Sequence, residues 1–377
     1  MSKIIVLGAG MVGSAIALDL SKKHIVGVAD FSENSLQKIQ EKNKEIKTFL
    51  LNVTNISELK KTIQDFDLVM CAVPGFLGFN TLKSCIEAKK NVVDISFFPE
   101  NSLELHELAL KYGVTAIVDC GVAPGMDNFI LGYENERYKL SHFECLVGGL
   151  PKIKKWPFAY KAPFSPIDVI EEYTRPARYV ENGHIVTKEA LSDIEHIEFE
   201  KLGTLESFNS DGLRSIIYTM SHIPNMKEKT LRYPGHADYV KVLKSSGFFG
   251  QQSMDFHGIK ISPIEFTSKI LFDEWKLQDE EEELTVMRVT LKGQNENGDT
   301  KTIVYNVHDE YCPQTKMSSM SRTTGYTACA AAQLFLDGLF DNKGVYPPEL
   351  IGKYENCFHF VLNYLKERGI DYMREEF

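Results

Sequence analysis

The sequence lacks the patterns that mark disulfide-stapled, zinc-bound and membrane-spanning proteins. Its seven cysteines are an odd number and no two have C-x-x-C spacing, which excludes a disulfide framework and a zinc ribbon and favours a reducing, cytoplasmic compartment. No apolar run reaches the roughly 18 residues that span a bilayer. The apolar run in residues 1–20 is broken by glycines and has no cleavage-site pattern, so we expect neither a signal peptide nor membrane attachment. H-x-x-H, H-E-x-x-H and acidic metal loops are absent, and we expect no metal.

Positive charge is also scarce. The 42 Lys and Arg residues are outnumbered by 52 Asp and Glu residues, which gives a formal charge of −10. Nucleic-acid binders usually show a basic surplus or stripe, and a negative field disfavours anionic membranes, so we expect neither as a partner. The 377 residues, at roughly 150 per domain, predict two or three domains. What remains is an enzyme or a ligand-binding module with a small-molecule partner.

The first third of the chain alternates strand and helix patterns. Short Ile- and Val-rich runs typical of buried strands are each followed by a segment with helical spacing of its apolar residues. We expect strands at 3–7, 24–30, 46–53, 67–73, 91–95 and 114–119, and helices at 14–22, 32–44, 56–64, 78–89 and 102–112. Repeated β-α units with short connections predict the α/β class, a Rossmann-type, doubly wound parallel sheet with helices on both faces.

The pattern changes after residue 121. Strand-like segments at 140–148, 177–186 and 194–201, and a hairpin at 284–307 around an Asn-, Gly- and Asp-rich turn, predict a second, α+β domain. A helical pattern returns at 318–340. The expected division is a Rossmann domain at 1–121, an inserted α+β domain at 122–312, and C-terminal helices at 313–377 that pack back on the Rossmann domain.

A glycine motif opens the chain. Gly8-Ala9-Gly10-Met11-Val12-Gly13 is G-x-G-x-x-G, placed after a strand and before a helix, which is the context the motif requires. Gly8 permits the tight turn, Gly10 lets a pyrophosphate approach the backbone, and Gly13 lets helix and strand pack closely. The phosphates would then lie on free N–H groups at the helix N-terminus, including those near Met11 and Val12. The motif predicts dinucleotide binding.

Asp30 sets the expected choice of cofactor. It ends the second strand about 20 residues after Gly8, where an acid hydrogen-bonds the ribose 2′-hydroxyl of NAD. A carboxylate at this place repels the 2′-phosphate of NADP, and residues 31–34 offer no basic side chain to bind it. We therefore predict NAD over NADP.

The carboxyl ends of the strands predict further cofactor contacts. In an open α/β sheet, ligands bind outside these ends, near the point where the strand order reverses. We expect the dinucleotide to pass Val73, Pro74 and Gly75. Its nicotinamide should face the ends of the next two strands, at Asp94–Ser96 and Asp119–Gly121.

Three later clusters each carry an arginine, namely Arg214 in SFNSDGLR, Arg232 in TLRYPGH and Arg322 in MSRTTG. Arginine captures a carboxylate through two parallel hydrogen bonds, so arginines facing a nicotinamide would favour an acidic or amino-acid substrate. His236, beside a Pro-Gly turn, is expected to titrate near neutral pH as an acid or base. Cys120 is either a buried apolar residue or a site thiol, and no base stands beside it in sequence.

Segments spread over nearly the whole chain resemble, in the same order, those of the saccharopine dehydrogenase-like family, and most closely its lysine 6-dehydrogenase branch. They include GAGMVGSAIALDL (8–20), AVPGFLGF (72–79), VVDISFFPENSLEL (92–105), VDCGVAPGMDNFILG (118–132), SPIDVIEEYTRPAR (165–178), SFNSDGLRS (207–215), TLRYPGH (230–236) and MSSMSRTTG (317–325). The resemblance implies a Rossmann domain completed by C-terminal helices, and an α+β domain that holds the substrate and mediates a homodimer.

The resemblance also implies an activity. It is the NAD-dependent oxidative deamination of the ε-amino group of L-lysine, which yields 2-aminoadipate 6-semialdehyde and ammonia. Arg214 and Arg232 would hold the substrate carboxylate, with Arg322 and Thr323 assisting and Cys120 in the substrate site.

This chemistry needs a base, because the ammonium must lose a proton before hydride can leave the adjacent carbon. Asp94, Asp119 and His236 are the titratable candidates near the expected nicotinamide site. The sequence does not choose among them.

Three alternatives stay open. One is a saccharopine dehydrogenase that forms L-glutamate, whose bulkier substrate carries three carboxylates and needs more cationic contacts. Another is a different imine reductase of the same family. A non-enzymatic alternative is an NAD-binding scaffold protein, which the downstream Arg, Asp and His clusters disfavour.

Overall fold

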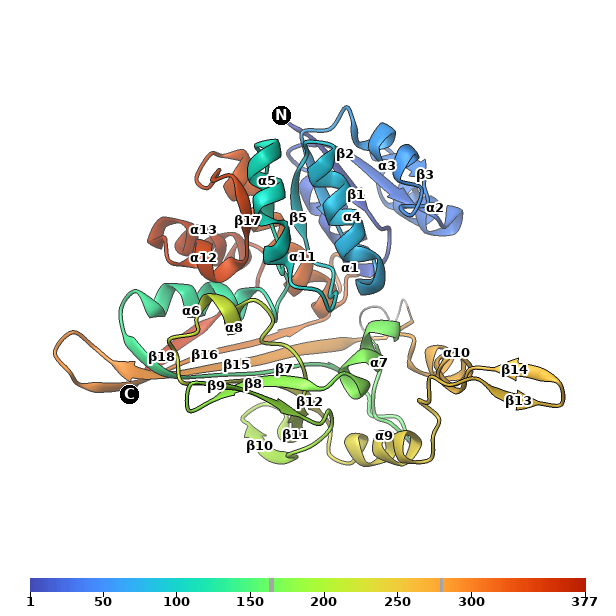
Figure 1. The fold of residues 1–377 in the computed structure, drawn as a ribbon. Coiled ribbons are helices and arrows are strands. Elements are labelled where there is room, and N and C mark those ends of the chain that lie inside the picture. The colour runs from blue at the N-terminus through green and yellow to red at the C-terminus, as the bar shows by residue number, and fades with distance from the viewer. Residues whose placement is uncertain (163–165, 279–280) are drawn as a thin grey trace.

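The computed structural model describes residues 1–162, 166–278 and 281–377, which form two lobes, each built on one large sheet (Figure 1). The first lobe is the seven-stranded sheet with the helices on its two faces. The second lobe is the nine-stranded sheet with its own helices. The parallel sheet beside a second mixed sheet confirms the predicted fold class.

All the strand pairs of the first lobe are parallel, in the order β17-β6-β5-β4-β1-β2-β3. Its strands are β1 (Lys3–Leu7), β2 (Ile25–Asp30), β3 (Lys47–Leu50), β4 (Leu68–Cys71), β5 (Asn91–Asp94), β6 (Thr115–Ile117) and β17 (Gly344–Tyr346). The helices between them are α1 (Met11–Leu20), α2 (Glu33–Lys42), α3 (Ile56–Ile63), α4 (Gly75–Glu87) and α5 (His106–Tyr112), which follows the 3-10 turn η1 (Ser102–Leu105).

Successive residues of a strand point to opposite faces, and this alternation divides the core. Ile4 and Val6 of β1 pack into a cluster that contains residues of α1 and α2. Ile5 and Leu7 pack into another, with residues of α3, α4 and α5. Because both faces are covered, these strands are apolar throughout, which is why short apolar runs predicted them well.

The second sheet has the order β10-β11-β12-β7-β15-β16-β18, with β8 pairing with β12 and β9. Its strands are β7 (Lys139–Pro151), β8 (Ala177–Glu181), β9 (His184–Lys188), β10 (Glu195–Phe199), β11 (Gly203–Asn209), β12 (Asn225–Arg232), β15 (Glu283–Gln294), β16 (Thr300–Glu310) and β18 (Met373–Glu376). The β15–β16 hairpin confirms the one predicted at 284–307. The β12–β7 pair is parallel.

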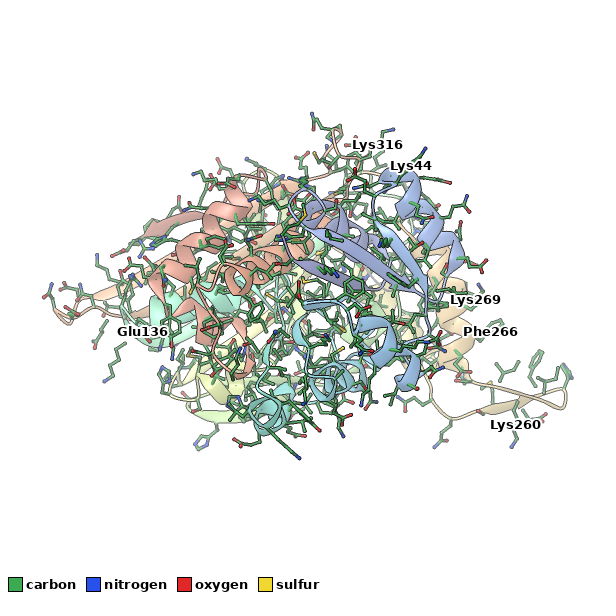
Figure 2. All side chains as sticks on the ribbon, turned by 90° about the horizontal axis from the view of Figure 1, so that it is seen from above. Lys44, Glu136, Lys260, Phe266, Lys269 and Lys316 are labelled. Carbon is green, nitrogen blue, oxygen red and sulfur yellow. The ribbon has the colours of Figure 1, made fainter. Side chains whose placement is uncertain are left out.

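Helices of the second lobe lie around this sheet, and two of them flank a projecting hairpin. They are α6 (Met126–Asn135), α7 (Pro166–Thr174), α8 (Ile216–Thr219), α9 (His236–Ser245) and α10 (Pro263–Trp275). Between α9 and α10 the chain forms a hairpin of β13 (Met254–Phe256) and β14 (Ile259–Ile261). Figure 2 shows this hairpin projecting from the body, with Lys260 on it and Phe266 and Lys269 near its base. Among the residues that the model describes, every helix is too short or too polar to cross a membrane.

The C-terminal segment touches both lobes. Its helices are α11 (Ser319–Leu336), α12 (Pro348–Gly352) and α13 (Glu355–Lys366), and α11 packs along α1. Two short strands in it were not expected from the sequence. β17 extends the first sheet beside β6, whereas β18 pairs with β16 in the second sheet. Neither has the apolar run by which the equally short β4, β5 and β6 were recognised, since β17 is Gly-Val-Tyr and β18 is Met-Arg-Glu-Glu.

One strand prediction needs correction. The segment at 177–186 was expected to be a single strand, but the chain turns at Asn182 and Gly183, both with positive φ, and returns as β9. An Asn-Gly pair favours this tight hairpin turn because both residues tolerate left-handed backbone. The Asn-Gly dipeptide was therefore a better guide than the apolar content of the segment.

Candidate active site

A cavity of about 1440 Å³ lies between the lobes. Its walls include the glycine turn before α1, the carboxyl ends of β2, β4 and β5, one face of β12 and β7, and parts of α7, α10 and α11. The first lobe therefore supplies the edge where an α/β sheet binds ligands, and the second lobe faces that edge.

The glycine turn has the shape of a dinucleotide cradle. A Cβ on Gly8 would lie 2.3 Å from the carbonyl oxygen of Ala72, and one on Gly13 would lie 2.0 Å from the carbonyl oxygen of Gly8. A Cβ on Gly10 would meet nothing within 4 Å. Gly8 and Gly13 thus allow the strand and helix to pack. Gly10 faces the cavity, where a side chain would occupy the space that a phosphate needs.

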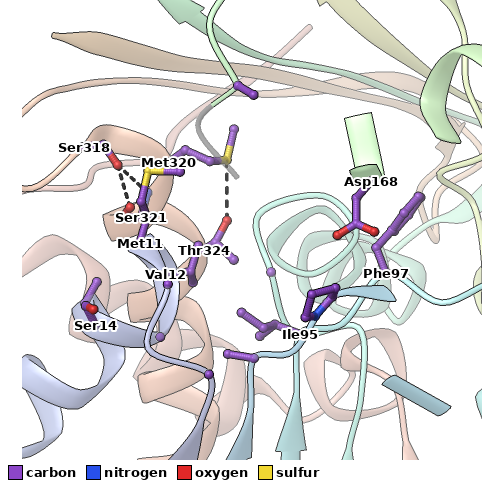
Figure 3. Close-up of a pocket in the computed structure, with 18 of the residues that line it drawn as sticks. Met11, Val12, Ser14, Ile95, Phe97, Asp168, Ser318, Met320, Ser321 and Thr324 are labelled. Carbon is purple, nitrogen blue, oxygen red and sulfur yellow. Dashed lines mark hydrogen bonds between the residues drawn. The ribbon is translucent and has the colours of Figure 1, made fainter. Parts of the chain in front are cut away.

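The N-terminus of α11 meets this turn from the other side of the cavity. Figure 3 shows Met11 and Val12 near Ser318 and Ser321, all of which line the cavity. The Ser318 hydroxyl caps α11 by accepting from the Ser321 N–H at 3.3 Å. Residues from opposite ends of the chain therefore surround the place where the turn would hold a pyrophosphate.

Asp30 lies at the cavity wall and stabilises the turn. Its Oδ2 accepts from the Ala9 N–H at 2.6 Å and its Oδ1 accepts from the Ser32 N–H at 2.8 Å. Lys38 and Lys42 of α2 line the same cavity. These lysines come from the helix rather than from residues 31–34, so the sequence argument for NAD did not consider them. The geometry accommodates a nicotinamide dinucleotide and leaves the choice between NAD and NADP open.

The other expected cofactor residues lie at the predicted edge. Val73, Pro74 and Ser96 line the cavity. Gly75 begins α4, and its N–H donates to the Oδ1 of Asp168 on α7 at 3.2 Å. Figure 3 shows Asp168 beside Phe97 in the cavity close-up. This contact joins the two lobes next to the expected path of the dinucleotide.

Asp94 lies behind the cavity wall. Its carboxyl is fully buried and accepts from the N–H and the hydroxyl of Ser96 at 2.9 and 3.3 Å. Burial raises its pKa to about 7, and the nearby Asp119 adds to the rise. Because Ser96 and not Asp94 lines the cavity, Asp94 supports the strand end and does not reach a substrate in this arrangement.

Asp119 and Arg214 form a buried ion pair across the lobes. Both have positive φ, of 53° and 46°. The Arg214 Nε donates to the Asp119 Oδ1 at 2.6 Å, and its Nη1 donates to the carbonyl of Phe98. Asp119 lines the cavity, whereas Arg214 lies behind it with its guanidinium engaged. The structure thus gives Arg214 a holding role toward Asp119, and its expected contact with the substrate carboxylate stays a prediction.

Arg232 lines the cavity at the end of β12. Its Nη2 donates to the Glu172 Oε2 at 2.7 Å, and its guanidinium lies 4.4 Å from the centre of the Tyr160 ring. Burial raises the pKa of Glu172, and the Arg232 charge opposes that rise. Its Nε and Nη1 also donate, to the Tyr173 hydroxyl at 3.4 Å and to the Leu231 carbonyl at 2.9 Å, so its expected contact with a substrate carboxylate stays a prediction.

Burial corrects the expectation for His236. Its ring is buried among aromatic residues, with Nδ1 2.9 Å from the carbonyl of Phe158 and Nε2 2.8 Å from the hydroxyl of Tyr173. Burial lowers its pKa to about 3, and the positive charge of Arg232 contributes. The ring is neutral at pH 7 and does not titrate near neutrality, because an apolar setting opposes the imidazolium form.

The remaining expected substrate residues lie away from the cavity lining. Cys120 is fully buried, and burial raises the pKa of its thiol far above the neutral range. Arg322 donates from Nη1 to both carboxylate oxygens of Asp309, at 3.0 and 2.9 Å. Thr323 donates back to the carbonyl of Ser319 within α11. Their neighbour Thr324 lines the cavity instead, since side chains one residue apart on a helix point about 100° apart.

Sequence reasoning missed several polar residues of the cavity wall. Arg175 lines it, pairs with Glu171 at 3.1 Å, and has a buried Nη1 with no hydrogen-bond partner among the described residues. Glu228 and Thr230 line it beside Arg232, two residues apart along β12. The segment SPIDVIEEYTRPAR contained the signal for Arg175, although its first residue lies outside the described residues. Glu228, Thr230 and Arg232 recur at every second residue, which places them on one face of a strand, although the polar Lys229 between them obscures the pattern.

Comparison with known proteins gives a consistent result. The family model of the saccharopine dehydrogenase NADP binding domain matches residues 4–117, and that of the saccharopine dehydrogenase C-terminal domain matches residues 121–370. The apo saccharopine dehydrogenase (L-Glu forming) of Saccharomyces cerevisiae has the same fold, with a TM-score of 0.80 at 21% identity and full coverage of both chains.

Curated relatives are distant in sequence. The mitochondrial alpha-aminoadipic semialdehyde synthase of Rattus norvegicus is 24% identical over 98% of this chain, and 47% of that protein is covered. This chain therefore spans about half the length of the first such relatives. The carboxyaminopropylagmatine dehydrogenase of Synechocystis is 23% identical, with 93% of this chain and 92% of that protein covered. The NADP-dependent, L-glutamate-forming saccharopine dehydrogenase of Saccharomyces cerevisiae is 29% identical over 53% of this chain and 48% of its own length.

Proposed function

Because this chain belongs to the saccharopine dehydrogenase family of oxidoreductases, we propose that it oxidises a carbon–nitrogen bond of an amino acid with a nicotinamide dinucleotide. The specific reaction that we propose is the NAD-dependent deamination of the ε-amino group of L-lysine. Its products would be 2-aminoadipate 6-semialdehyde and ammonia.

The negative charge of the cavity wall is our reason for proposing lysine and not saccharopine as the substrate. Among the described residues that line it, acidic side chains outnumber basic ones by eleven to six. Arg175 and Arg232, the arginines of this lining, are each paired with a glutamate. A negative wall favours a substrate with an additional ammonium group and disfavours saccharopine, which brings three carboxylates. Lysine fits this field better than a tricarboxylate does.

The glycine turn, the α1 N-terminus and Asp30 are the groups that would hold the cofactor. When bound, the oxidised nicotinamide ring accepts a hydride from the substrate carbon. The protein's part is to place that carbon against the ring and to keep the amine neutral at the moment of transfer.

The second lobe would orient the substrate. Arg232 and the Arg175 Nη1, which has no hydrogen-bond partner among the described residues, would bind the α-carboxylate and so fix one end of the substrate. After hydride transfer, water adds to the imine carbon and ammonia leaves, so the site must admit one water. Asp119, held by Arg214, is a carboxylate of the cavity wall that can orient this water.

The L-glutamate-forming saccharopine dehydrogenase is the second candidate. Lys38 and Lys42, which line the same cavity as Asp30, favour it, because positive charge on this wall would attract the 2′-phosphate of NADP. The yeast relative with that activity is also the most similar in percentage identity of those given above. In this alternative Arg175, Arg232 and Lys276 of the cavity wall would share the substrate carboxylates.

A cofactor and substrate screen separates the candidates. The purified protein is given lysine, ornithine or saccharopine, each with NAD and with NADP, and formation of the reduced nicotinamide is followed by absorbance. We expect turnover with lysine and NAD, and equimolar release of ammonia. Turnover that requires saccharopine and releases glutamate would replace the proposal with the second candidate. Cofactor binding without turnover of any substrate would favour a scaffold.

A further inference from the structure

We propose that Glu228, coupled to Asp127, accepts the proton that the substrate amine loses before hydride transfer. This inference rests on the proposed function, because it assigns a base to that reaction. Of the acids and bases expected from the sequence, Asp94 and His236 lie behind the wall, and Asp119 is held by Arg214. Glu228 lies in the wall itself.

The position of Glu228 follows from the alternation of β12. Glu228, Thr230 and Arg232 share one face of the strand, and all three line the cavity. With a rise of about 3.3 Å per residue, Glu228 and Arg232 stand roughly 13 Å apart along the strand. Lysine carries a carboxylate at one end and an amine at the other end of its side chain. The strand therefore offers a cation for one end and a carboxyl for the other.

Glu228 has a second carboxyl beside it. Asp127 stands in the first turn of α6, and Cys145 is the register partner of Glu228 on β7. A carboxylate oxygen of each acid and the Cys145 Sγ lie within 4.8 Å of one another. The Asp127 Oδ2 and the Glu228 Oε2 are buried and accept no hydrogen bond from any described residue. Two buried carboxyls this close disfavour ionisation of each other, because the second negative charge would form beside the first.

The backbone makes room for this arrangement. A Cβ on Gly212 would lie 1.8 Å from the Glu228 Oε1, so any larger residue would displace the carboxyl. Gly212 also lines the cavity. A glycine at this position keeps the carboxyl at the wall.

The charges around Glu228 increase the affinity of its carboxylate for a proton. The groups that face it are Asp127 on α6, Cys145 on β7, Asp211 with its partner Arg178, Glu172 with its partner Arg232, and Arg214. Burial raises the pKa of Glu228 well above its usual value, Asp127, Asp211 and Glu172 add to the rise, and Arg214 opposes it. Burial likewise raises the pKa of Asp127 to about 7. A raised acceptor pKa lies closer to that of an amine, which makes proton transfer less uphill.

The step balances in atoms and charge. An N–H bond of the substrate ammonium breaks and an O–H bond forms on Glu228, which leaves the nitrogen lone pair free. That pair forms the C=N bond as the hydride, with its two electrons, passes from carbon to the oxidised nicotinamide. Water then adds to carbon, the C–N bond breaks, and ammonia departs. The proton on Glu228 leaves to solvent before the next cycle.

The first test is Glu228→Gln. We expect kcat/KM for lysine to fall by about 10²–10⁴-fold, the range for a lost general base. The dissociation constant for NAD should stay unchanged, because Glu228 lies on the second lobe. Glu144→Gln is the matched control, since Glu144 precedes Cys145 on β7 and pairs with Lys227. Retention of wild-type kcat/KM in Glu228→Gln would overturn the proposal.

The second test is Asp127→Asn, which keeps the acceptor for the Gly125 N–H and removes the charge beside Glu228. The acidic limb of the kcat/KM–pH profile should then move to lower pH, because Glu228 loses the neighbouring negative charge that raises its pKa. A purely structural role for Asp127 would lower the melting temperature and leave the limb in place. An unmoved limb would therefore refute the coupling.

An infrared measurement separates this inference from the proposed function. The substrate-free protein at neutral pH should show a protonated-carboxyl band that weakens in both Glu228→Gln and Asp127→Asn. A band of this kind in a protein that does not oxidise lysine would refute the function and retain the pair. Absence of the band would refute the pair. Mass spectrometry gives a further check. A metal ion bound in stoichiometric amount, and lost in Glu228→Gln, would also refute the pair, because Asp127, Cys145 and Glu228 would then bind a cation in place of a proton.

Discussion

Arginine side chains of this protein have the same chemistry and different surroundings. Arg232 reaches the cavity with Glu172 beside it, Arg214 is turned toward Asp119, and Arg322 is turned toward Asp309. Each pair is largely buried, so removing one partner leaves an uncompensated charge. What differs is which group a ligand could still reach. At the scale of residues, the role of each arginine depends on whether a ligand can still reach its guanidinium group.

Arg232→Ala tests the carboxylate contact. We expect KM for lysine to rise by about 10–100-fold, since hydrogen bonds to a charged group contribute about 1.5–3 kcal/mol. NAD affinity should be unchanged. Arg288→Ala is the control, because Arg288 is also on the second sheet but contacts Asn306 and Phe199 outside the cavity. Steady-state kinetics and NAD titration give both values, and weakened NAD binding would contradict the assigned role.

Asp30→Asn tests the cofactor choice. Asn keeps one acceptor oxygen for the Ala9 N–H and removes the negative charge. We expect NAD to bind about 10-fold more weakly and the preference over NADP to narrow, since the repulsion of a 2′-phosphate is lost. Asp67→Asn is a control, because Asp67 accepts from the Lys3 N–H at the opposite edge of the same sheet. An unchanged NAD/NADP ratio would refute the cofactor argument.

At the scale of elements, α11 links the two sheets. It packs along α1 of the first lobe, while Arg322 and Ser319 bind Asp309 at the end of β16 in the second. The Arg322 Nη2 also donates to the carbonyl of Arg368 at 2.8 Å. The helix N-terminus that faces the glycine turn is therefore held by contacts outside the cavity. Arg322 would therefore affect the site by holding the N-terminus of α11 in place, without touching a ligand.

Arg322→Leu should destabilise the fold strongly. Removing one partner of a buried ion pair typically costs about 3–5 kcal/mol, and Asp309 would be left buried beside Glu283. We expect a melting temperature several degrees below wild type. The double variant Arg322→Leu/Asp309→Leu should recover much of the loss, because neither charge then remains buried. Arg137→Leu, which breaks the more exposed pair with Glu355, is the control. Equal melting temperatures for the Arg322→Leu variant and wild type would exclude this anchoring role.

At the scale of the whole molecule, the active cavity exists only where the lobes meet. The Asp119–Arg214 pair and the Gly75–Asp168 hydrogen bond both cross between them. Closing the cavity between the lobes also buries several acids, among them Asp94, Asp127 and Glu228. Buried acids link the stability of the whole fold to pH.

Asp94 gives a measurable case. Its pKa is about 7 in the folded protein and about 3.9 in an unfolded chain, so the folded state binds more protons between these values. Its contribution to stability is present at low pH and is lost as pH rises through about 7. Asp94→Asn stays neutral, so its free energy of unfolding should rise relative to wild type by about 1.4 kcal/mol per pH unit between roughly pH 5 and 7. Urea unfolding over that range measures this difference, and a constant difference would contradict it.

Local patterns predicted the first lobe and its cofactor edge. Each β-α unit folds from residues close in sequence. Gly13 packs against Gly8 within one strand–turn–helix, and Asp30 ends the next strand, so composition and spacing were sufficient. The local clusters predicted three arginines and the resemblance predicted the family of oxidoreductases, although neither told which arginines face the cavity.

The substrate side depended on tertiary packing. The approach of Glu228 to Asp127 requires the parallel register of β12 with β7 and the seating of α6 beneath them, which join residues about 100 positions apart. Whether His236 is charged, and whether Arg214 or Arg175 has a free donor, depends on burial and partners that no short segment contains. Residue type defines what a side chain can do. Its pKa and access are set by the low-dielectric surroundings that form only when distant segments pack together.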